Sequence, residues 1–497
     1  MKYSLLSKKP DSPAYCGVIY DLSADRAVNN LSDDKKRNEY FLSVLSSPLT
    51  DVENIRYRQE IFEDLSRCEG LFDALKLIFT RYDRIKTDWQ DMKLGSISSS
   101  ETNPEAFLRH SFASLKVTAI FPSTMASFFE NIASTLGKYD IRSEALCDMK
   151  KRCDAMRGEE ALGNIVEISQ LFRYGEIEDY DFSLLVKADG LLYPEKADIS
   201  AVSPVKKKQG GLAGLFKKDK KAENVITVGT AHSETGNDPQ ECSSYLLGCA
   251  LADIDRKLTE ITNNLYEIFY GLSNELMFYE IGLLYMDEAK KQGVPLCYPT
   301  ILPAEDDVIR LKNVKELLLL SGGKGRETVP NDIDIGSSRA GMIIKGLTDS
   351  GKTVFLRAVA GAQLLAQSGL PVLAEEARLS VRGGFFSHFS SAEEDFLIGS
   401  AQGRFDQEAG EISRIIDNFR THSLLLLNET FQTTSYEEGT ESIYNILRYM
   451  PKLGAKYIFV THLTRLFDYM HGENVMLAST SNDPATKYKI IIGESKN

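Results

Sequence analysis

Hydrophobic residues recur at helical spacing over the first three-fifths of the chain. Between Phe41 and Ile85 the apolar positions mostly fall three or four residues apart, which predicts amphipathic helices. Two interruptions are expected, at 46–48 and at 119–122, because each ends in a proline, which favours a break in a helix. This part of the chain is therefore predicted to be a mostly α-helical region.

The longest apolar stripe begins at Ile254. Apolar side chains follow at intervals of three and four as far as Met286, and Gly293 and Pro295 mark the end of the pattern. This spacing puts a continuous stripe on one face of a single, very long helix. Packing in a helical core is the simpler interpretation of the stripe, and a lever-like helix is the alternative.

In the last third of the chain, short apolar runs alternate with segments whose apolar residues have helical spacing. The runs 340–345, 423–427 and 456–460 have the character of buried strands, and 354–367 reads as a helix. Strands that alternate with helices indicate an α/β domain with a parallel sheet. The C-terminal part is therefore predicted to differ in fold class from the helical part.

These patterns predict a multidomain protein. A chain of 497 residues is long enough for two to four domains, and a hydrophobic content of 43% can fill their cores. The expected parts are an N-terminal segment at 1–40, a helical region at 41–300 and an α/β domain at 301–497.

Composition narrows the class of protein. The N-terminus lacks the apolar stretch of a signal peptide and no apolar run reaches the length of a bilayer span, so we expect a cytoplasmic protein without membrane contact. The seven cysteines form no CxxC pair, which argues against a disulfide framework and a zinc site. The formal charge of −13 does not favour strong nonspecific binding to duplex DNA, although it permits a local basic patch.

One segment matches the GxxxxGKT pattern of a phosphate-binding loop. Its residues are Gly346, Leu347, Thr348, Asp349, Ser350, Gly351, Lys352 and Thr353. The two glycines leave no Cβ to block the approach of phosphate oxygens to backbone N–H groups. Lys352 supplies a charge to the outer phosphates, and the Thr353 hydroxyl can ligate Mg²⁺. Because the loop lies between a predicted strand and a predicted helix, the sequence predicts a nucleoside triphosphate as ligand.

Two later strands end in polar residues that suit the rest of a hydrolytic site. The run 423–427 leads into Asn428 and Glu429, where Asp-Glu is the usual pair. Glu429 is the candidate general base, and Asn428 lies where an aspartate would hold Mg²⁺. His462 follows the run 456–460 and is expected near the γ-phosphate, because ligands bind at the carboxyl ends of parallel strands.

A segment at about 203–224 combines glycine, proline and lysine, which is typical of a loop. Its lysines could contact nucleic acid or another anionic surface, and a solvated linker is the simpler interpretation. They are Lys206, Lys207, Lys208, Lys217, Lys218, Lys220 and Lys221.

Several motifs of the C-terminal region together resemble the MutS ATPase domain. In the matching order they are Pro330-Asn331-Asp332, the phosphate-binding loop, Gly399 to Phe405 with Glu408 and Glu411, Asn428-Glu429, Thr433-Thr434-Ser435 and Thr461-His462. The segment 47–59 also resembles the opening of the MutS core domain, so the similarity extends from about residue 40 to residue 497.

The resemblance implies a helical core with lever arms joined to a P-loop ATPase of the ABC type, which binds ATP and Mg²⁺. Such proteins usually work as dimers with nucleotide between the subunits, so a nucleotide-dependent homodimer or a hetero-partner is expected. The family's trans-acting serine corresponds to Gly403, or to Ser400 in a shifted register, and Arg404 could act in its place. The family's Pro-Asn in the loop is Leu347-Thr348 here, which keeps the backbone cradle.

Two functions remain open. In the first, the chain is a MutS-like ATPase that couples nucleotide state to movement of helical arms on DNA. Non-mismatch DNA such as branched DNA is expected, because the part before residue 40 has no room for mismatch-reading domains. In the second, it is a nucleotide-dependent switch that binds a protein partner with weak hydrolysis, which the acidic charge and Asn428 favour. An SMC- or Rad50-like ATPase is a further alternative, but those proteins need longer coiled coils.

Overall fold

The computed structural model describes residues 3–96, 103–188, 194–204, 239–390, 404–431, 435–481 and 483–493. The chain folds into two compact units. The first comprises Met1–Tyr3, Asp73–Tyr139 and Asp148–Gly271, and the second comprises Ser4–Phe72, Asp140–Cys147 and Leu272–Asn497. Because the chain passes between the units several times, their boundaries differ from the consecutive segments 1–40, 41–300 and 301–497.

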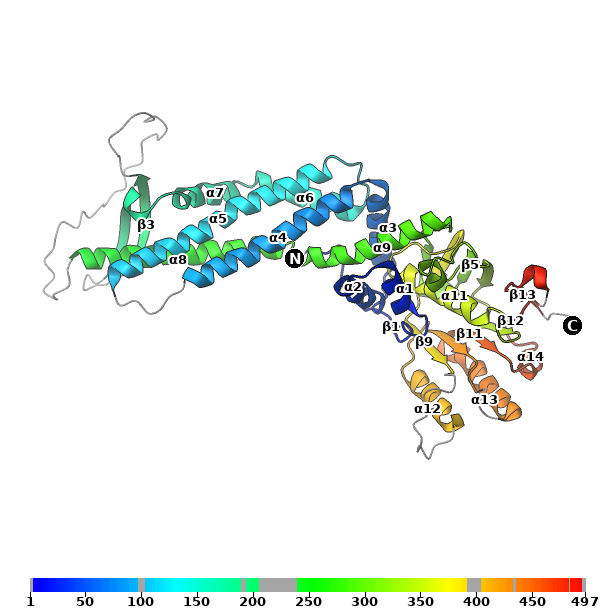
Figure 1. Ribbon diagram of the computed structural model, residues 1–497. Coiled ribbons are helices and arrows are strands. Elements are labelled where there is room, and N and C mark those ends of the chain that lie inside the picture. Colours follow the sequence, from blue (N-terminus) through cyan, green and yellow to red (C-terminus); the bar gives the residue numbers. More distant parts are fainter. Residues whose placement is uncertain are drawn as a thin grey trace. The chain divides into compact units, whose positions relative to one another are not determined.

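Long helices and one hairpin make up the first unit. The helices are α4 (Leu71–Ser96), α5 (Pro104–Leu136), α6 (Glu144–Gly158), α7 (Glu160–Arg173) and α8 (Pro239–Glu267), of which α4 and α6 begin in the second unit. The antiparallel hairpin joins β2 (Tyr180–Ala188) to β3 (Pro194–Pro204). Helix α5 packs lengthwise against α7 and α8 (Figure 1), and Phe112, Leu115 and Leu251 are buried between them.

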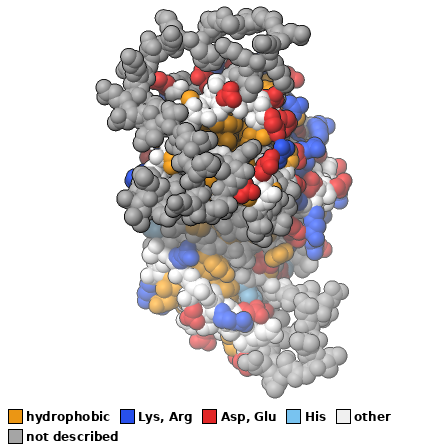
Figure 2. Space-filling view, turned by 90° about the vertical axis from the view of Figure 1, so that its left-hand side faces the viewer, with side chains coloured by type: hydrophobic (Ala, Val, Ile, Leu, Met, Phe, Trp, Pro, Cys, Tyr) orange, Lys and Arg blue, Asp and Glu red, His pale blue; other side chains and the backbone are white. Residues whose placement is uncertain are grey.

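The surface of this unit mixes both signs of charge. On the face seen in Figure 2, acidic and basic side chains of the described residues lie next to one another around hydrophobic areas. Ion pairs such as Arg109 with Glu178, 3.0 Å apart, belong to this surface. The basic loop predicted at about 203–224 lies almost entirely outside the described residues.

Two expectations about the helices are wrong. The break expected at 119–122 is absent, because α5 continues through Pro122. Proline removes one hydrogen bond from a helix, but Ala119, Phe121 and Met125 are buried around it, and their packing offsets that loss. The single helix expected from Ile254 is two helices, since α8 ends at Glu267 and α9 (Leu272–Gln292) begins after Gly271, whose φ is +88°.

Helix α5 also corrects the expectation that no apolar run is long enough to span a bilayer. By length and composition alone, Pro104–Leu136 could cross a membrane, and half of its most apolar window is buried in the structure. Burial of that kind is normal for the core helix of a bundle. This single helix is therefore only weak evidence that the chain crosses a membrane.

The second unit contains two sheets. The larger has the order β1-β9-β10-β11-β7-β12-β13, and its strands pair in parallel except for β12 with β13. These strands are β1 (Tyr15–Cys16), β7 (Gly341–Lys345), β9 (Gly384–Phe389), β10 (Leu424–Asn428), β11 (Lys456–Thr461), β12 (Val475–Thr480) and β13 (Ile490–Ile492). The three predicted strands are thus β7, β10 and β11, and they are neighbours in the sheet.

Helices and a smaller sheet complete the unit. The helices are α1 (Ala24–Leu31), α2 (Lys35–Leu45), α3 (Val52–Arg67), α9, α10 (Leu317–Ser321), α11 (Lys352–Gln367), α12 (Arg404–Asp417), α13 (Tyr436–Tyr449) and α14 (Arg465–Met470). The four-stranded sheet has the order β4-β8-β5-β6, with β4 (Thr300–Leu302), β5 (Ile309–Val314), β6 (Asn331–Ile335) and β8 (Glu376–Ser380). The predicted break at 46–48 falls between α2 and α3, and the predicted helix at 354–367 is the body of α11.

A buried charge cluster lies at the amino end of β11. Asp307 accepts hydrogen bonds from Lys456 Nζ at 2.7 Å and from Arg382 Nη1 at 2.5 Å. Both cationic side chains are buried, and burial lowers the pKa of each, although Asp307 opposes that shift. A buried cation that loses its carboxylate is left with an uncompensated desolvation cost. Asp307 therefore compensates two buried charges at once.

We expect Asp307→Asn to lower the free energy of unfolding by about 3 kcal/mol, because it leaves Lys456 and Arg382 buried without a counter-charge. Chemical denaturation monitored by circular dichroism measures the change. The control is Asp334→Asn, whose ion pair with Arg310 is exposed and should contribute less than about 1 kcal/mol. Equal effects of the two substitutions would contradict the assignment.

Candidate nucleotide-binding site

The glycine-rich loop joins a central strand of the larger sheet to a buried helix. Residues 346–351 leave the carboxyl end of β7 and enter α11 at Lys352. Gly351 has a φ of +87°, which favours glycine, and a Cβ at Gly346 would collide with the hydroxyl and methyl groups of Thr480. The chain can follow this path only with glycine at both positions.

Lys352 is the buried charge of the site. Its side chain is only 4% exposed, and its ammonium group donates to the carbonyl oxygens of Gly346 at 2.9 Å and Leu347 at 2.8 Å. Burial lowers the pKa of this lysine, while the nearby Glu429 carboxylate opposes the shift. The loop backbone therefore places the ammonium group among groups that stabilise its charge.

Glu429 and His462 meet this lysine at the carboxyl ends of three adjacent strands. The Glu429 Oε1 atom is 3.7 Å from Lys352 Nζ and 3.1 Å from His462 Nε2. The Nζ and Nε2 atoms are themselves 3.4 Å apart. Three candidates that are distant in sequence thus lie within one group, in which a carboxylate lies beside a buried cation and an imidazole, as an acid–base site requires.

The two candidate Mg²⁺ ligands contact each other. Thr353 Oγ1 donates a hydrogen bond to Asn428 Oδ1 over 2.9 Å. Both are neutral oxygen donors, whereas Mg²⁺ is usually held by one or two carboxylates together with phosphate oxygens. Among the described residues, no group of three or more His, Cys, Asp or Glu side chains is placed to hold a metal ion. The donor set fits an ion held chiefly by nucleotide phosphates, with Thr353 as its protein ligand.

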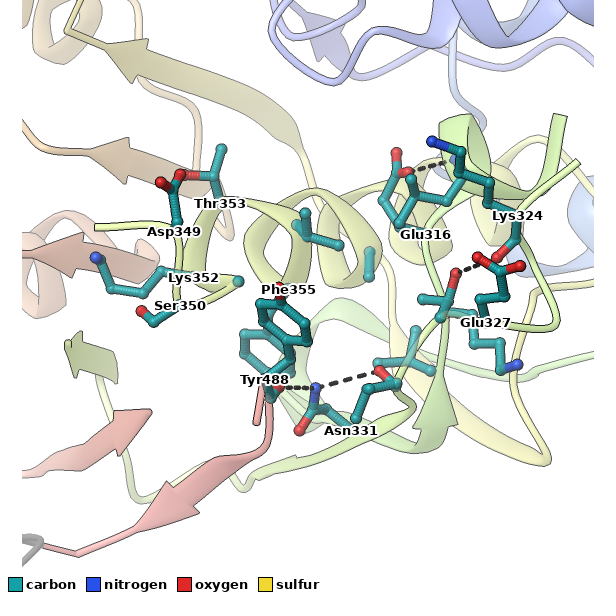
Figure 3. Close-up of a pocket in the computed structure, with 18 of the residues that line it drawn as sticks. Glu316, Lys324, Glu327, Asn331, Asp349, Ser350, Lys352, Thr353, Phe355 and Tyr488 are labelled. Carbon is teal, nitrogen blue, oxygen red and sulfur yellow. Dashed lines mark hydrogen bonds between the residues drawn. The ribbon is translucent and has the colours of Figure 1, made fainter. Parts of the chain in front are cut away.

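The loop borders a cavity of about 680 Å³. Figure 3 shows Asp349, Ser350, Lys352 and Thr353 at one end, and Glu316, Lys324 and Glu327 at the other. The volume lies within the usual range for small-molecule sites. Burial raises the pKa of Glu316, although its carboxylate accepts two backbone N–H groups of α10. Both ends of the cavity therefore carry acidic and basic side chains. Lys352 lies with Asp349 and Glu429 at the loop, and Lys324 lies with Glu316 and Glu327 at the opposite end.

Sequence reasoning missed the aromatic residues of this cavity. The sequence shows no evident aromatic residue that could stack on a base, because Thr328 and Val329 occupy the segment just before Pro330. In the structure Tyr488 lines the cavity between the two ends, near Phe355 (Figure 3). The Asn331 amide donates to the Tyr488 carbonyl oxygen at 3.0 Å and so holds this segment at the cavity. No local motif around Tyr488 marks it in the sequence.

The remaining candidates contribute little to the described site. Ser400 and Gly403 lie outside the described residues. Arg404 is the first residue of α12. The Asp349 carboxylate lies near enough to Lys352 to oppose the lowering of its pKa, and Ser350 Oγ donates to the Leu347 carbonyl oxygen at 2.6 Å within the loop. The described chemistry is therefore concentrated at Lys352, Thr353, Asn428, Glu429 and His462.

Fold and site together define a mixed helix–sheet domain with a glycine-rich loop at the carboxyl end of a central parallel strand. Residues 342–493 match the family model of MutS domain V, which is the ATPase domain of that family. The C-terminal part of the chain is therefore similar to the ATPase domain of MutS proteins, as its sequence motifs indicate.

Named relatives match the same region. A DNA mismatch repair protein MutS from Caldanaerobacter subterraneus is 32% identical over 174 residues, which cover 34% of this chain and 20% of that protein. An endonuclease MutS2 from Halalkalibacterium halodurans is 34% identical over 173 residues, or 34% of this chain and 22% of the relative. An endonuclease MutS2 from Lactobacillus helveticus is 31% identical over 162 residues, which cover 33% of this chain and 20% of that protein. The matches thus span about a fifth of each relative's length.

We expect Gly346→Ala to weaken nucleotide binding at least tenfold, because the added methyl group would displace the loop from Thr480. Isothermal titration with ATP measures the effect. Adding Thr480→Ala removes both colliding atoms and should restore much of the affinity, whereas Thr480→Ala alone should bind like the wild type. A Gly346→Ala variant with wild-type affinity would contradict this reading of the loop.

Proposed function

We propose that this protein is a MutS-like ATPase that binds ATP at the loop 346–353 and hydrolyses it slowly, with the nucleotide state coupled to helical arms that act on DNA. The observation that supports it best is the convergence of Lys352, Glu429 and His462, whose reactive groups lie 3.1 to 3.7 Å apart. The family match to an ATPase domain over the same residues supports it independently.

Each residue has a distinct role in this proposal. The loop N–H groups and the Lys352 ammonium bind the phosphates, because a buried cation interacts strongly with an anion. Glu429 orients the attacking water and accepts its proton as general base. His462 fixes the Glu429 carboxylate by their 3.1 Å contact and faces the position of the transferred phosphate. Mg²⁺, held by Thr353 and the nucleotide, would neutralise phosphate charge.

The DNA part of the proposal rests on the relatives, which are named a DNA mismatch repair protein and an endonuclease. The long helices of the first unit are the candidate arms. Mixed charge on the visible face of that unit favours modest electrostatic affinity for DNA. We therefore expect DNA to act through its effect on turnover more than through tight binding.

The experiment is ATP turnover by the purified protein alone and with duplex, single-stranded or four-way-junction DNA. Lys352→Ala defines the background, and Lys291→Ala, an exposed lysine on α9, is the matched control. We expect turnover that Lys352→Ala reduces at least 100-fold, Lys291→Ala leaves unchanged and one form of DNA increases. Turnover that is insensitive to Lys352→Ala would refute the ATPase assignment, and turnover that no DNA changes would refute the DNA part.

A nucleotide-dependent switch with a protein partner is the second candidate. Asn428 favours it, because the side chain that hydrogen-bonds to Thr353 is neutral where a carboxylate would attract Mg²⁺. A weakly held metal ion slows hydrolysis while ATP still binds. The two candidates therefore differ in how strongly Asn428 limits the reaction.

We expect Asn428→Asp to raise turnover three- to tenfold and to lower the Mg²⁺ concentration that gives half-maximal activity. The aspartate can accept the same hydrogen bond from Thr353 and adds one negative charge near the ion. Asn445→Asp adds the same charge at an exposed position of α13, away from the site, and should change neither quantity. A flat response to Asn428→Asp would show that another step limits turnover.

A further inference from the structure

The candidate general base lies in a strained turn. Directly after β10, Glu429 has a φ of +60° and Phe431 a φ of +62°. Residues with a side chain rarely adopt these left-handed angles, and a bulky aromatic residue does so only when its surroundings impose them. The position of the Glu429 carboxylate therefore depends on whatever holds residues 429–431 in this conformation.

One face of α12 supplies the contacts that hold the turn. Glu408 Oε2 accepts the backbone N–H of Phe431 at 2.8 Å, and its Oε1 accepts the Ser390 hydroxyl at 2.9 Å. The Phe405 ring, one turn earlier on the same face, packs with its centroid 5.3 Å from that of Phe431. Glu408 is only 8% exposed, so its two hydrogen bonds are shielded from water.

A histidine extends this network to the middle of the turn. The His388 Nδ1 atom is 2.9 Å from Thr430 Oγ1, and its Nε2 atom is 3.2 Å from Glu411 Oε2 on α12. A neutral His388 protonated at Nε2 satisfies both contacts, since Nε2–H donates to Glu411 while Nδ1 accepts the Thr430 hydroxyl. Phe431 thus bonds directly to the Glu408 carboxylate, and Thr430 is linked through His388 to the Glu411 carboxylate of the same helix.

The turn has one further anchor, on the opposite side. The Glu429 N–H donates to the Val460 carbonyl oxygen of β11 at 2.9 Å, next to the strand end that carries His462. Glu429 therefore lies between a fixed strand and a helix whose carboxylates hold the following two residues. Removal of the helix contacts would leave the strand contact intact but release Phe431.

We propose that Glu408 is a positioning residue, which holds the 429–431 turn so that the Glu429 carboxylate faces Lys352 and His462. The position of α12 then controls the rate of hydrolysis while leaving nucleotide binding at the loop largely unchanged. This inference rests on the ATPase function proposed above. It assigns to Glu408 a role that acts through Glu429 and requires no contact with the nucleotide.

Three variants test the proposal: Glu408→Ala, Glu408→Gln and, as a matched control, Glu437→Ala, which removes an exposed carboxylate on α13. The glutamine keeps an oxygen for the Phe431 N–H and can still pair with Ser390, so it should retain turnover to within about threefold. We expect Glu408→Ala to lower kcat 10- to 100-fold with less than a threefold change in ATP affinity. Glu437→Ala should resemble the wild type.

Hydrogen–deuterium exchange gives a second readout that does not depend on catalysis. Loss of the Glu408 contact frees the Phe431 N–H, so exchange in a peptide covering 424–431 should accelerate in Glu408→Ala and stay slow in Glu408→Gln. A Glu408→Ala variant with wild-type kcat, or with unchanged exchange at 424–431, would overturn the proposal. So would a parallel loss of ATP affinity and kcat, which indicates general damage to the fold.

The outcome also separates this inference from the proposed function. If the wild type showed no turnover that depends on Lys352, the ATPase function would fail, and the exchange experiment would still decide whether Glu408 holds the turn. If the wild type hydrolyses ATP but Glu408→Ala does so equally well, only the positioning role fails.

Discussion

The buried ammonium group of Lys352 is the constraint on which the rest of the site depends. A cation that is only 4% exposed is costly unless nearby groups replace the water it has lost. Two loop carbonyl oxygens do so directly, and the Glu429 carboxylate contributes from 3.7 Å. The loop must therefore curl around the lysine, and β10 must end where its glutamate can reach. The same arrangement holds the charge at the edge of the cavity that borders the loop, where the proposed function places the phosphates.

The register of the parallel sheet meets this requirement. Asn428 of β10 lies opposite Val460 of β11, and Thr461 of β11 lies opposite Lys345 of β7, so the three strands end within one residue of each other. The leucines of β10 are fully buried, and a buried strand has little freedom to slip along its neighbours. Hydrophobic packing in the sheet thus sets the distances between polar groups that lie beyond it.

The sequence predicts this part of the molecule well because its signals are local. The strand, the glycines and the lysine are contiguous, and each buried strand leads directly into its polar residue. The Tyr488 position was not predictable in the same way, since the chain reaches the cavity only after β12 and is held there by Asn331. The apolar stripe from Ile254 likewise continues across Gly271 and hides the break between α8 and α9. Pairing of β1 with β9 depends on contacts across hundreds of residues, which no local pattern records.

Asn428 links the two functional interpretations in physical terms. An aspartate at that position would attract Mg²⁺ but would also repel the phosphates of a nucleotide that arrives without it. At ~5 Å and an effective dielectric constant of ~20, each of these interactions amounts to about 3 kcal/mol before compensation. The neutral amide removes both, while it keeps the hydrogen bond that orients Thr353. Under the proposed function, nucleotide affinity would therefore depend less on the metal ion than it does in a site with the carboxylate, while hydrolysis would still require the ion. A protein with this balance would remain in its ATP-bound state for longer, which suits both proposed functions, a slow DNA-associated ATPase and a partner-binding switch. The effect of DNA on turnover therefore separates the two.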